Sequence, residues 1–494
     1  MRHAETLSDA FDAAARRAGG RLAVREKNRD WTYAELLVRS QDLSRRLEAM
    51  CRAPGQRIAL MLPNSGAFVA AFFAVARCGG VVTPLNVRYG SQELVHYLGD
   101  ANPAALLVAP ELRGQVMEAS SRLARPPTVM EVGEDGRCQA LVEGDVGAPS
   151  AASGDSPPLL HQYTSGSTGQ PKRVVRTHRN LLFELERLRG TFQLEETDRF
   201  LGAAPFSHVN GLVRTMLASM FVGAALFPVR EFRRREVLEL IHRERLTFFG
   251  GVPYMFVLLG ETPPRGEVDL SSLRVVFSSS APLLPADNRH FHARYGLYIR
   301  QLYGSTETGT ISVNLKPGVE QNLESVGLPL DGVRVEIRGD DGRTLPADVE
   351  GEVAVASPAA IEAYEGNAEA SAATFQGGWY LSGDLGRKDT EGYLTLTGRK
   401  KFLINRGGYK VNPLEVEAAI RSHPKVREVA VVGAPGLHGD EVVRCVVVPA
   451  SACTAEEISR HCQGKIADFK IPSRIEFRDS LPKSDTGKVL RQSL

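Results

Sequence analysis

The chain has 494 residues, more than one hydrophobic core organises, so roughly two to four domains are expected. Lysine and arginine number 60 against 58 aspartates and glutamates, and the net charge of +2 gives no reason to expect a nucleic acid or an anionic membrane as partner. The six cysteines are scattered without a Cys-x-x-Cys pair, which argues against a structural zinc site or a disulfide framework and favours a reducing compartment.

No targeting or membrane-spanning segment is expected from the sequence. Residues 1–20 are polar and lack the apolar core of a secretion signal. The longest apolar run, 67–76, is about half the length that a helix needs to cross a bilayer. These features predict a cytoplasmic protein without an integral membrane segment.

The first part of the chain alternates helix and strand patterns. Helices are expected over the amphipathic segment from Leu7 to Ala15, after the capping box Thr32-x-x-Glu35, and over the apolar segment 68–75. Buried strands are expected at 58–62 and 104–108. This alternation predicts a parallel sheet covered by helices, followed by an irregular link over 134–158, where Gly, Ala, Ser, Asp and Pro dominate.

The same rhythm returns further along the chain, with helices expected at 180–192 and 238–243 and strands at 200–205, 248–252 and 275–279. Strand patterns at 332–337 and 352–356, with a turn at Asp340–Gly342, indicate instead an antiparallel region.

Roughly the last hundred residues are expected to form a small α+β unit that is large enough to fold on its own. It is expected to contain a helix over 413–422, strands at 426–432 and 442–448, and a helix over 454–462 that opens with the capping box Thr454-x-x-Glu457.

Between the two stretches of alternating helices and strands, Tyr163 to Val174 is expected to form a loop suited to binding polyphosphate. Its glycines allow close backbone approach, its hydroxyls and N–H groups form an anion trap, and a lysine adds positive charge. It is neither a Walker loop nor a dinucleotide fingerprint. A flexible Ser/Gly linker is the alternative, but Pro-Lys and a β-branched pair follow at once. The phosphate-binding residues are predicted to be Thr164, Ser165, Gly166, Ser167, Thr168, Gly169 and Lys172.

A second specific stretch reads Tyr-Gly-Ser-Thr-Glu-Thr-Gly from Tyr303 to Gly309. The aromatic ring can stack on a base, and Gly304 permits close approach. Thr306 can donate to a phosphate, and Glu307 is a hard oxygen ligand suited to Mg²⁺. Core packing alone does not ask for this order of residues.

Together these stretches resemble the signatures of the adenylate-forming superfamily, which includes acyl-CoA synthetases, peptide-synthetase adenylation domains and beetle luciferases. Four further stretches match it in order and spacing, so that the resemblance covers nearly the whole chain: Ser278–Leu283, Trp379–Asp384, Thr397–Glu415 and Pro482–Lys488. In Trp379–Asp384 a carboxylate follows a predicted tight turn, and one carboxylate can accept from both ribose hydroxyls; here Ser382 replaces the usual Thr.

The resemblance implies an α/β fold with a large N-terminal domain of two helix-covered sheets and a small β-barrel-like subdomain. A small mobile α+β domain follows it. The expected boundaries are 1–398 for the N-terminal domain, 399–401 for the hinge and 402–494 for the C-terminal domain.

The resemblance also implies roles for individual residues. Adenine and ribose would contact Ser280, Ala281, Pro282, Tyr303, Gly304, Ser305, Asp384 and Arg399. Lys401 would be the hinge residue, and the pantetheine arm of CoA would pass Gly407, Gly408 and Tyr409. Lys488 would orient the substrate carboxylate and offset charge that develops at the α-phosphate.

The acid itself is expected to lie beside the stretch 205–212, which resembles the segment before the acyl pocket of acyl- and aryl-CoA ligases. The pocket is predicted to be lined by Phe206, His208, Asn210, Gly211, Gly251, Val252, Phe256 and Ser279. His208 would gate the acid site or hold its carboxylate, with a core histidine as the alternative. The chain lacks the Phe-Asp pair that amino-acid adenylation domains have here, and Phe256 and Val257 are apolar, which favours a largely apolar monocarboxylic acid.

The expected reaction is a two-step ligation in which ATP and the acid give acyl-AMP and CoA then takes the acyl group, with Lys488, Glu307, His208 and Thr306 as the catalytic set and Mg²⁺ on Glu307. No carrier-protein domain follows in the sequence. A luciferase-like oxygenase shares the fold and the first step and is the alternative from another class.

Two departures from the family pattern bear on this reaction. Arg173 stands where relatives usually have Gly, and it would either tighten ATP binding or fill the pyrophosphate space. In the second case the chain would be a half-enzyme that takes preformed acyl-AMP and makes only the thioester. Phe402 stands where an acidic residue is usual after the hinge, so altered domain dynamics are expected.

Overall fold

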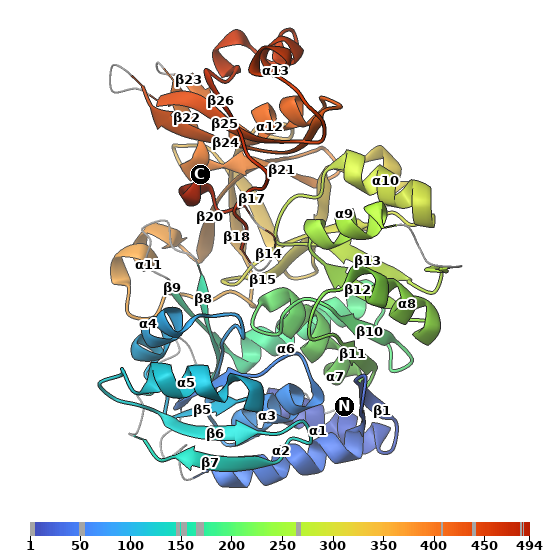
Figure 1. The fold of residues 1–494 in the computed structure, drawn as a ribbon, viewed down its shortest axis with the longest axis vertical. Helices are drawn as coiled ribbons and strands as arrows, with labels where there is room; N and C mark the ends of the chain where they lie inside the picture. The colour runs from blue at the N-terminus through green and yellow to red at the C-terminus, as the bar shows by residue number, and fades with distance from the viewer. Residues whose placement is uncertain are drawn as a thin grey trace.

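The computed structural model describes residues 5–48, 55–144, 149, 156–164, 172–262, 268–406, 409–436, 441–484, 487 and 489–494. Two large sheets with their helices form the lower part of the molecule in Figure 1, and the C-terminal elements gather at its upper end. No helix in the described ranges is long and apolar enough to cross a membrane.

A seven-stranded sheet forms the first layer, and its central strands are parallel. In spatial order it contains β7 (Cys138–Val142), β6 (Thr128–Val132), β5 (Ala105–Val108), β3 (Arg57–Met61), β4 (Val81–Pro84), β8 (Pro158–Thr164) and β9 (Lys172–Thr177). The helices of this part are α1 (Leu7–Ala18), α2 (Tyr33–Leu47), α3 (Gly66–Arg77), α4 (Ser91–Ala101) and α5 (Arg113–Ser120).

Strand β3 explains why both faces of this sheet need helices. Ile58 and Leu60 belong to the core that contains α3, whereas Ala59 and Met61 belong to the core that contains α4 and α5. Successive side chains point to opposite faces of a strand, so an uninterrupted apolar run is buried on both. The predicted helix-covered parallel sheet is confirmed here.

The second sheet has fourteen strands among the described residues. Its main path runs β17 (Arg334–Arg338), β18 (Gly351–Ala356), β20 (Trp379–Lys388), β21 (Leu394–Arg399), β16 (Ser325–Pro329), β15 (Gly309–Val313), β14 (Arg300–Ser305), β13 (Val275–Ser278), β12 (Phe248–Gly251), β10 (Arg199–Gly202), β11 (Ala225–Pro228), β1 (Leu22–Arg25) and β2 (Asp30–Thr32), with β19 (Phe375–Gln376) paired to β20. The strands from β11 to β14 are parallel, and those from β14 to β17 are antiparallel, as expected from the change in sequence pattern.

The helices associated with the second sheet are α6 (His178–Phe192), the π-helix η2 (Asn210–Leu217), α7 (Ala218–Val222), α8 (Arg234–Glu244), α9 (Pro253–Glu261), α10 (Pro285–Tyr295) and α11 (Ala368–Thr374). Alternate residues of β12 again divide between two cores, because Phe248 packs with α6 and Phe249 packs with α8 and α9. The sequence did not predict the π-helix, an element that is rare and frequently occurs at functional sites.

The C-terminal lobe, defined here as the described residues from β22 onward, has its own core around Val416, Val443 and Ile458. Its elements are β22 (Ile404–Arg406), β23 (Tyr409–Val411), α12 (Pro413–Arg421), β24 (Val426–Pro435), β25 (Glu441–Pro449), α13 (Ala455–Cys462) and β26 (Arg474–Phe477). Thr454 and Glu457 form the predicted capping box at the start of α13. The expected α+β unit is therefore present.

Two local predictions were wrong. Residues 138–142, placed in an irregular link, form β7, which pairs with β6 across a turn where Gly136 has φ +70°; an Asp-Gly turn is a hairpin signal that the composition of the segment obscured. Asp384, placed after a tight turn, lies within β20 beside a bulge, where Gly383 has φ +69°. The bulge still projects the carboxylate out of the regular ladder.

Candidate active site

The carboxyl ends of β12 and β13 meet at one edge of the second sheet, and the parallel strand β14 continues past them in the same direction. Gly251 lies opposite Ser278, and Ser278 lies opposite Gln301. Ligands of open α/β sheets bind at this edge. The chain continues from it into the predicted adenine segment, where Ser280 has φ +73°, a left-handed conformation that is strained for a non-glycine residue. Ala281 and Pro282 follow at this same edge.

The predicted ribose residues are brought together around one carboxylate. The Tyr303 hydroxyl donates to Asp384 Oδ2 at 2.7 Å, and Arg399 Nε pairs with Asp384 Oδ1. Asp384 and Arg399 are cross-strand partners in β20 and β21. Burial raises the pKa of the Tyr303 hydroxyl, and the negative charge of Asp384 adds to the shift, so Tyr303 remains a donor.

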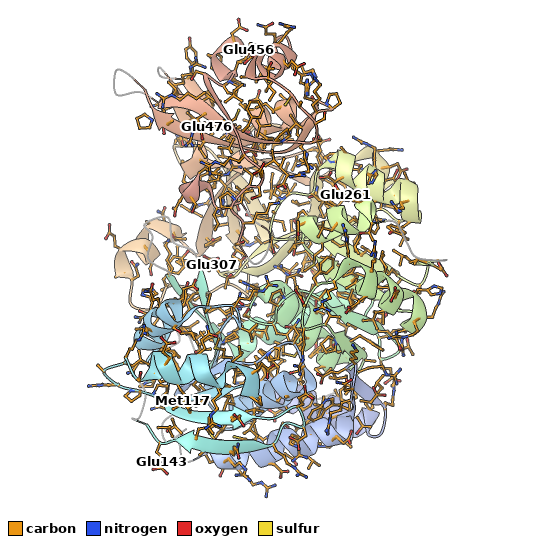
Figure 2. All side chains as sticks on the ribbon, in the orientation of Figure 1. Met117, Glu143, Glu261, Glu307, Glu456 and Glu476 are labelled. Atoms are coloured by element: carbon orange, nitrogen blue, oxygen red, sulfur yellow. The ribbon has the colours of Figure 1, made fainter. Side chains whose placement is uncertain are left out.

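Glu307 lies near the middle of the molecule (Figure 2) and is 7% exposed. Its Oε1 accepts a hydrogen bond of 3.0 Å from the Tyr364 hydroxyl. The ammonium of Lys172 stands 4.4 Å from the centre of the Tyr364 ring. Tyr364 thus joins the lysine at the end of the phosphate loop to the predicted magnesium ligand, a role that no local sequence signal indicated.

The surroundings of Glu307 fit a magnesium ion that is held mainly by substrate. Among the described residues there is no group of three or more His, Cys, Asp or Glu side chains that could hold a metal. Mg²⁺ usually keeps several waters and binds through one or two carboxylates and substrate phosphates. A single carboxylate such as Glu307 fits this pattern, with the remaining positions left to waters and substrate phosphates.

Arg173 is held on the side of the sheet where α4 lies. Its Nε donates to Asp100 Oδ2 at 2.8 Å, its Nη2 pairs with Asp100 Oδ1, and the Tyr163 hydroxyl donates to Asp100 Oδ2 at 2.7 Å. Tyr163 and Arg173 are cross-strand partners in β8 and β9. Arg173, which departs from the family pattern, is therefore paired with a residue on another element. This partner, Asp100, was not predicted from the sequence.

The predicted acyl-pocket residues also converge. Asn210 Nδ2 and the Ser279 backbone N–H both donate at 3.1 Å to the carbonyl of Gly251, and Phe256 lies against Gly251. The side chains of Phe206, Val252 and Phe256, which are predicted to line the pocket, are apolar and buried. A Cβ on Gly211 would stand 2.3 Å from the Pro205 carbonyl oxygen, so this position requires glycine.

Asn64, missed by the sequence analysis, fixes the segment that enters this pocket. Its amide donates to the carbonyls of Gly202 and Ala204 at 3.1 and 2.9 Å, and its Oδ1 accepts from the Phe206 N–H at 2.8 Å. His208 follows two residues later, with its backbone N–H bonded to the Pro205 carbonyl.

The predicted hinge residue lies beside two of the predicted nucleotide-binding residues. Burial lowers the pKa of Lys401, and the positive charges of Arg399 and Lys172 lower it further. The Lys401 ammonium stands 5.0 Å from the centre of the Phe402 ring, and the guanidinium carbon of Arg491 stands 5.5 Å from it. Phe402 thus contacts two cations at the position where the family resemblance leads us to expect an acidic side chain.

The loop that carries the last motif rests on the N-terminal part of the chain. A Cβ on Gly487 would stand 2.9 Å from the Tyr254 Cβ, and the Lys483 ammonium stands 5.1 Å from the centre of the Tyr254 ring. Tyr254 belongs to α9, the helix that begins next to Val252 of the predicted acyl pocket.

Several predicted residues cannot be located in this way. Ser165, Gly166, Ser167, Thr168 and Gly169 of the phosphate loop, Gly407 and Gly408 of the CoA path, and Lys488 lie outside the described residues. Thr164 and Lys172, which border the phosphate loop, are described. Tyr409 is 60% exposed and stacks on Phe469 with ring centres 4.6 Å apart.

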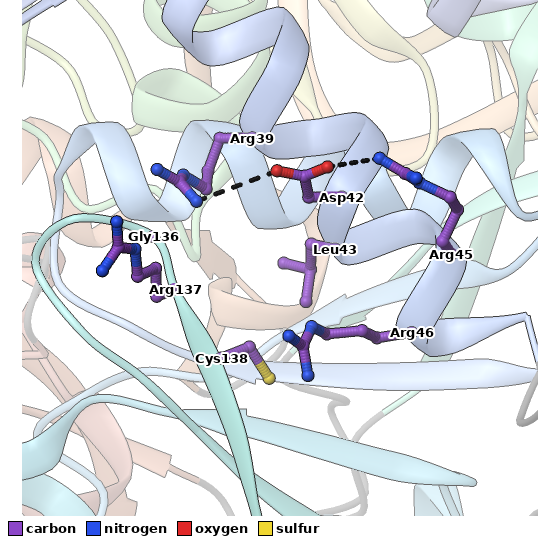
Figure 3. A pocket seen from close by; sticks show the side chains of 8 residues that line it. All are labelled: Arg39, Asp42, Leu43, Arg45, Arg46, Gly136, Arg137 and Cys138. Atoms are coloured by element: carbon purple, nitrogen blue, oxygen red, sulfur yellow. Dashed lines mark hydrogen bonds and ion pairs between the residues drawn. The ribbon is translucent and has the colours of Figure 1, made fainter.

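A separate cleft of about 580 Å³ lies between α2 and the β6–β7 hairpin (Figure 3). Asp42 pairs there with Arg39 at 3.8 Å and with Arg45, while Arg46 and Arg137 extend the basic lining. The cleft shares no residue with the site at the sheet edge, so it does not enter the chemistry considered below.

Residues 11–365 match the AMP-binding enzyme family, and residues 415–488 match the AMP-binding enzyme C-terminal domain. The chain belongs to the adenylate-forming superfamily, in its acyl-CoA synthetase branch. It is an acid–thiol ligase.

Individual relatives agree along the full chain. A feruloyl-CoA synthase of Amycolatopsis sp is 34% identical over 97% of this chain and 96% of its own, and an indoleacetate–CoA ligase of Aromatoleum aromaticum is 33% identical over 99% and 97%. The crystal structure of ATP-bound MatB from Rhodopseudomonas palustris, 28% identical, covers 98% of both chains with a TM-score of 0.88. The apo structure of the same protein, at the same identity and coverage, gives 0.76.

Proposed function

We propose that the chain carries out both steps of acyl-CoA synthesis, with the residues assembled at the sheet edge binding ATP and the acid. The observation that carries this is the contact chain Lys172–Tyr364–Glu307, which brings the lysine of the phosphate loop to the predicted magnesium ligand. The Asp384, Arg399 and Tyr303 cluster supplies the matching ribose site.

In the first step an oxygen of the acid's carboxylate attacks the α-phosphorus of ATP. The bond from that phosphorus to the bridging oxygen breaks, and pyrophosphate leaves. Lys172 and Thr306 would bind the polyphosphate, and Lys488 would orient the carboxylate. Glu307 would hold Mg²⁺, which neutralises phosphate charge. Positioning and fixed charges of this kind are the main sources of rate in phosphoryl and nucleotidyl transfer.

In the second step the thiol of CoA loses its proton and the thiolate attacks the carbonyl of the acyl-AMP. The acyl–oxygen bond breaks, and AMP leaves with the electron pair. We propose that the C-terminal domain, 402–494, turns about Lys401 between the steps and exchanges Lys488 for Gly408. The exposure of Tyr409 is compatible with a surface that receives CoA only after this rotation.

The present arrangement supports the first of the two orientations. The loop containing Gly487 rests against Tyr254 beside the acyl pocket, where Lys488 would be needed for adenylation. The higher TM-score of the ATP-bound MatB structure compared with the apo structure points the same way, because sequence identity and coverage are equal in the two comparisons.

The bidentate pairing of Arg173 with Asp100 favours the full reaction over the half-enzyme. Because the guanidinium of Arg173 is paired with Asp100 on α4, its side chain does not have to occupy the space of the pyrophosphate. The strength of charge-assisted bidentate pairs makes this position stable. We therefore propose that Arg173 braces β9 against α4.

For the acid, we propose an apolar body that carries one hydrogen-bond donor. Phe206, Val252 and Phe256 suit the apolar body, and the names of the feruloyl-CoA and indoleacetate relatives support an aromatic one. Asn210 Oδ1 is buried without a hydrogen-bond partner among the described residues, although its Nδ2 is fixed by Gly251. An unpaired buried acceptor costs about 1–3 kcal/mol, which a donor on the acid would recover.

The test is a panel of acids assayed for AMP formation with and without CoA. It should include pairs of aryl acids that differ only by a ring hydroxyl. We expect CoA-dependent AMP formation, with the hydroxylated member preferred and the preference abolished in Asn210→Leu. AMP formation from none of the acids would contradict the proposed function, whereas equal use of both pair members would contradict only the donor requirement.

A further inference from the structure

A buried cluster of charges lies behind the turn that carries Thr306 and Glu307. It consists of Arg176 on β9, Glu184 on α6 and Arg214 on the π-helix, with side chains 0%, 1% and 3% exposed. Arg176 Nη2 stands 2.7 Å from Glu184 Oε2, and Arg214 Nε stands 3.8 Å from Glu184 Oε1. The cluster joins β9 and α6, which follow each other directly in the chain, to the π-helix further along.

The cluster holds the C-terminal end of the turn by direct hydrogen bonds. Arg214 Nε donates to Thr310 Oγ1 at 2.8 Å, and its Nη2 donates to the Gly309 carbonyl at 3.4 Å. The Thr310 N–H and hydroxyl donate to Glu184 Oε1 at 2.9 and 2.7 Å. The backbone at Gly309 and Thr310 is therefore hydrogen-bonded both to a cation, Arg214, and to an anion, Glu184.

The same cluster explains the two glycines that bracket the turn. A Cβ on Gly304 would stand 2.3 Å from Arg214 Nη2, and a Cβ on Gly309 would stand 2.4 Å from Glu184 Oε2. Gly309 also has φ +68°, a conformation that favours glycine. The sequence predicts close approach of the ligand at Gly304, whereas in the structure Arg214 Nη2 and the Gly309 carbonyl oxygen are equally near to the position of its missing Cβ, at 2.3 Å.

Stability alone is a weak reason for such a cluster. Buried ion pairs are often no more stabilising than well-packed apolar residues of similar volume, because their desolvation is costly. Here two arginines share one carboxylate, and Arg176 Nε and Nη1 have no hydrogen-bond partner in the described structure. The cluster does fix the orientation of the groups that it binds, because the planar guanidinium of an arginine sets the geometry of its hydrogen-bond partners.

The positions of β9, the π-helix and β15 indicate which parts of the proposed site the cluster holds in place. Strand β9 begins with Lys172 at the end of the phosphate loop, the π-helix begins with Asn210 in the acyl pocket, and β15 follows Glu307. Arg176 and Arg214 thus connect the segments that would hold the polyphosphate, the acid and Mg²⁺.

We propose that Arg214, held by Glu184, which in turn pairs with Arg176, is a positioning residue of the adenylation step. It fixes the turn from Gly304 to Gly309 so that Thr306 and Glu307 meet the polyphosphate in register with the acid. This inference rests on the proposed function, because it assigns the cluster to the ATP-dependent step and not to the transfer of the acyl group to CoA.

The experiment separates the two half-reactions in Arg214→Gln and Arg214→Lys. Pyrophosphate release from ATP and acid measures the first step, and acyl-CoA formation from synthetic acyl-AMP measures the second. A misplacement of about 1 Å costs about 100-fold in rate, so we expect Arg214→Gln to lose about 100-fold in pyrophosphate release. The thioester step should keep its wild-type rate, and Arg214→Lys should recover part of the first step.

Arg77→Gln is the matched control, because Arg77 pairs with Asp12 on α1, away from the sheet edge, and should leave both steps unchanged. A parallel fall of both half-reactions in Arg214→Gln would show a merely structural role and overturn the inference, as would full retention of pyrophosphate release. Absence of pyrophosphate release from the wild type would overturn the proposed function as well.

Discussion

The interior beneath the nucleotide site and the contacts of the C-terminal lobe are held by different kinds of interaction. Beneath the site, Arg176 and Glu184 form an ion pair whose side chains are 0% and 1% exposed. Between the lobe and the rest of the chain, Arg421 pairs with Asp287 at 3.3 Å with exposures of 29% and 22%. Solvated pairs contribute about 0–1 kcal/mol, whereas breaking a buried pair costs about 3–5 kcal/mol.

This difference matches what the two-step reaction requires. In the proposed mechanism the residues that bind ATP must hold one geometry while the acyl-AMP forms, and their supports are buried and multiply bonded. In the proposed mechanism the lobe leaves and returns, and its contacts with the rest of the chain are partly exposed and individually weak: Arg421 with Asp287, Lys410 with Asp340, and Lys483 with the ring of Tyr254.

The largest effect is expected from the buried carboxylate. Glu184→Gln leaves Arg176 and Arg214 without a counter-charge and should lower the free energy of unfolding by about 3–5 kcal/mol, as measured by denaturant titration. The matched lobe variant is Glu457→Gln, which breaks a half-exposed pair with Lys425 and should cost no more than about 1 kcal/mol. Equal losses in the two variants would erase the distinction between the two regions.

A smaller, functional effect is expected at the ribose cluster. Asp384→Asn removes the charge that accepts from Tyr303 and Arg399, and a charge-assisted hydrogen bond contributes about 1.5–3 kcal/mol. We expect the KM for ATP to rise about 10- to 100-fold by that principle, while the KM for CoA stays unchanged. Steady-state kinetics with each substrate varied in turn provide the measurement, and a selective rise in the KM for CoA would contradict the assignment.

Acid should destabilise the N-terminal part more than the lobe. Burial lowers the pKa of His178, whose Nδ1 accepts from the Leu7 N–H at 3.0 Å, to about 4. Above pH 6.5 the folded and unfolded states are both neutral at this residue, so it adds no pH dependence. As the pH falls from 6.5 towards 4, the unfolded chain takes up a proton that the folded chain refuses, and stability decreases.

At pH 5 the penalty at His178 amounts to about 2 kcal/mol, because one pKa unit corresponds to about 1.4 kcal/mol. Thermal unfolding between pH 7 and pH 5 should therefore show a smaller decrease in midpoint for His178→Gln than for the wild type. Burial and the neighbouring Lys465 also lower the pKa of His461 in the lobe, but His461 is more exposed than His178, so His461→Gln should reduce the pH dependence less than His178→Gln does. An unchanged slope in His178→Gln would refute this assignment.

The smallest effect is expected at the lobe contact itself. Arg421→Ala should lower the free energy of unfolding by less than about 1 kcal/mol, since the pair it breaks is partly solvated. A loss above about 2 kcal/mol in denaturant titration would place this contact with the buried pairs of the interior, and the lobe would then be fixed where we propose that it moves.

Short motifs predicted much of this architecture because their residue order has few structural alternatives. Tyr303, Asp384 and Arg399 are distant in the sequence, yet the family resemblance assigned them to one nucleoside site, and the structure places them in contact. Periodicity likewise predicted the helix-covered sheets, since a continuous apolar strand must be buried on both faces.

The supporting residues could not be predicted in this way. Tyr364, Asn64 and Asp100 contact segments that are 57, 142 and 73 residues away, and no local pattern reports such contacts. Glu184 and Arg214 are charged residues of the kind usually found on solvated helix faces. Only the packing of β9, α6 and the π-helix shows that they are buried. Long-range polar contacts of this kind depend on the tertiary arrangement, which a single sequence does not display.

The central claim, that the chain itself makes acyl-AMP, is tested most directly by pyrophosphate release. Wild type and Arg173→Gly should be compared with ATP and a panel of acids, alongside thioester formation from synthetic acyl-AMPs. The pairing of Arg173 with Asp100 predicts robust release by the wild type. A wild type that converts acyl-AMP to acyl-CoA but releases pyrophosphate only after Arg173→Gly would contradict the account.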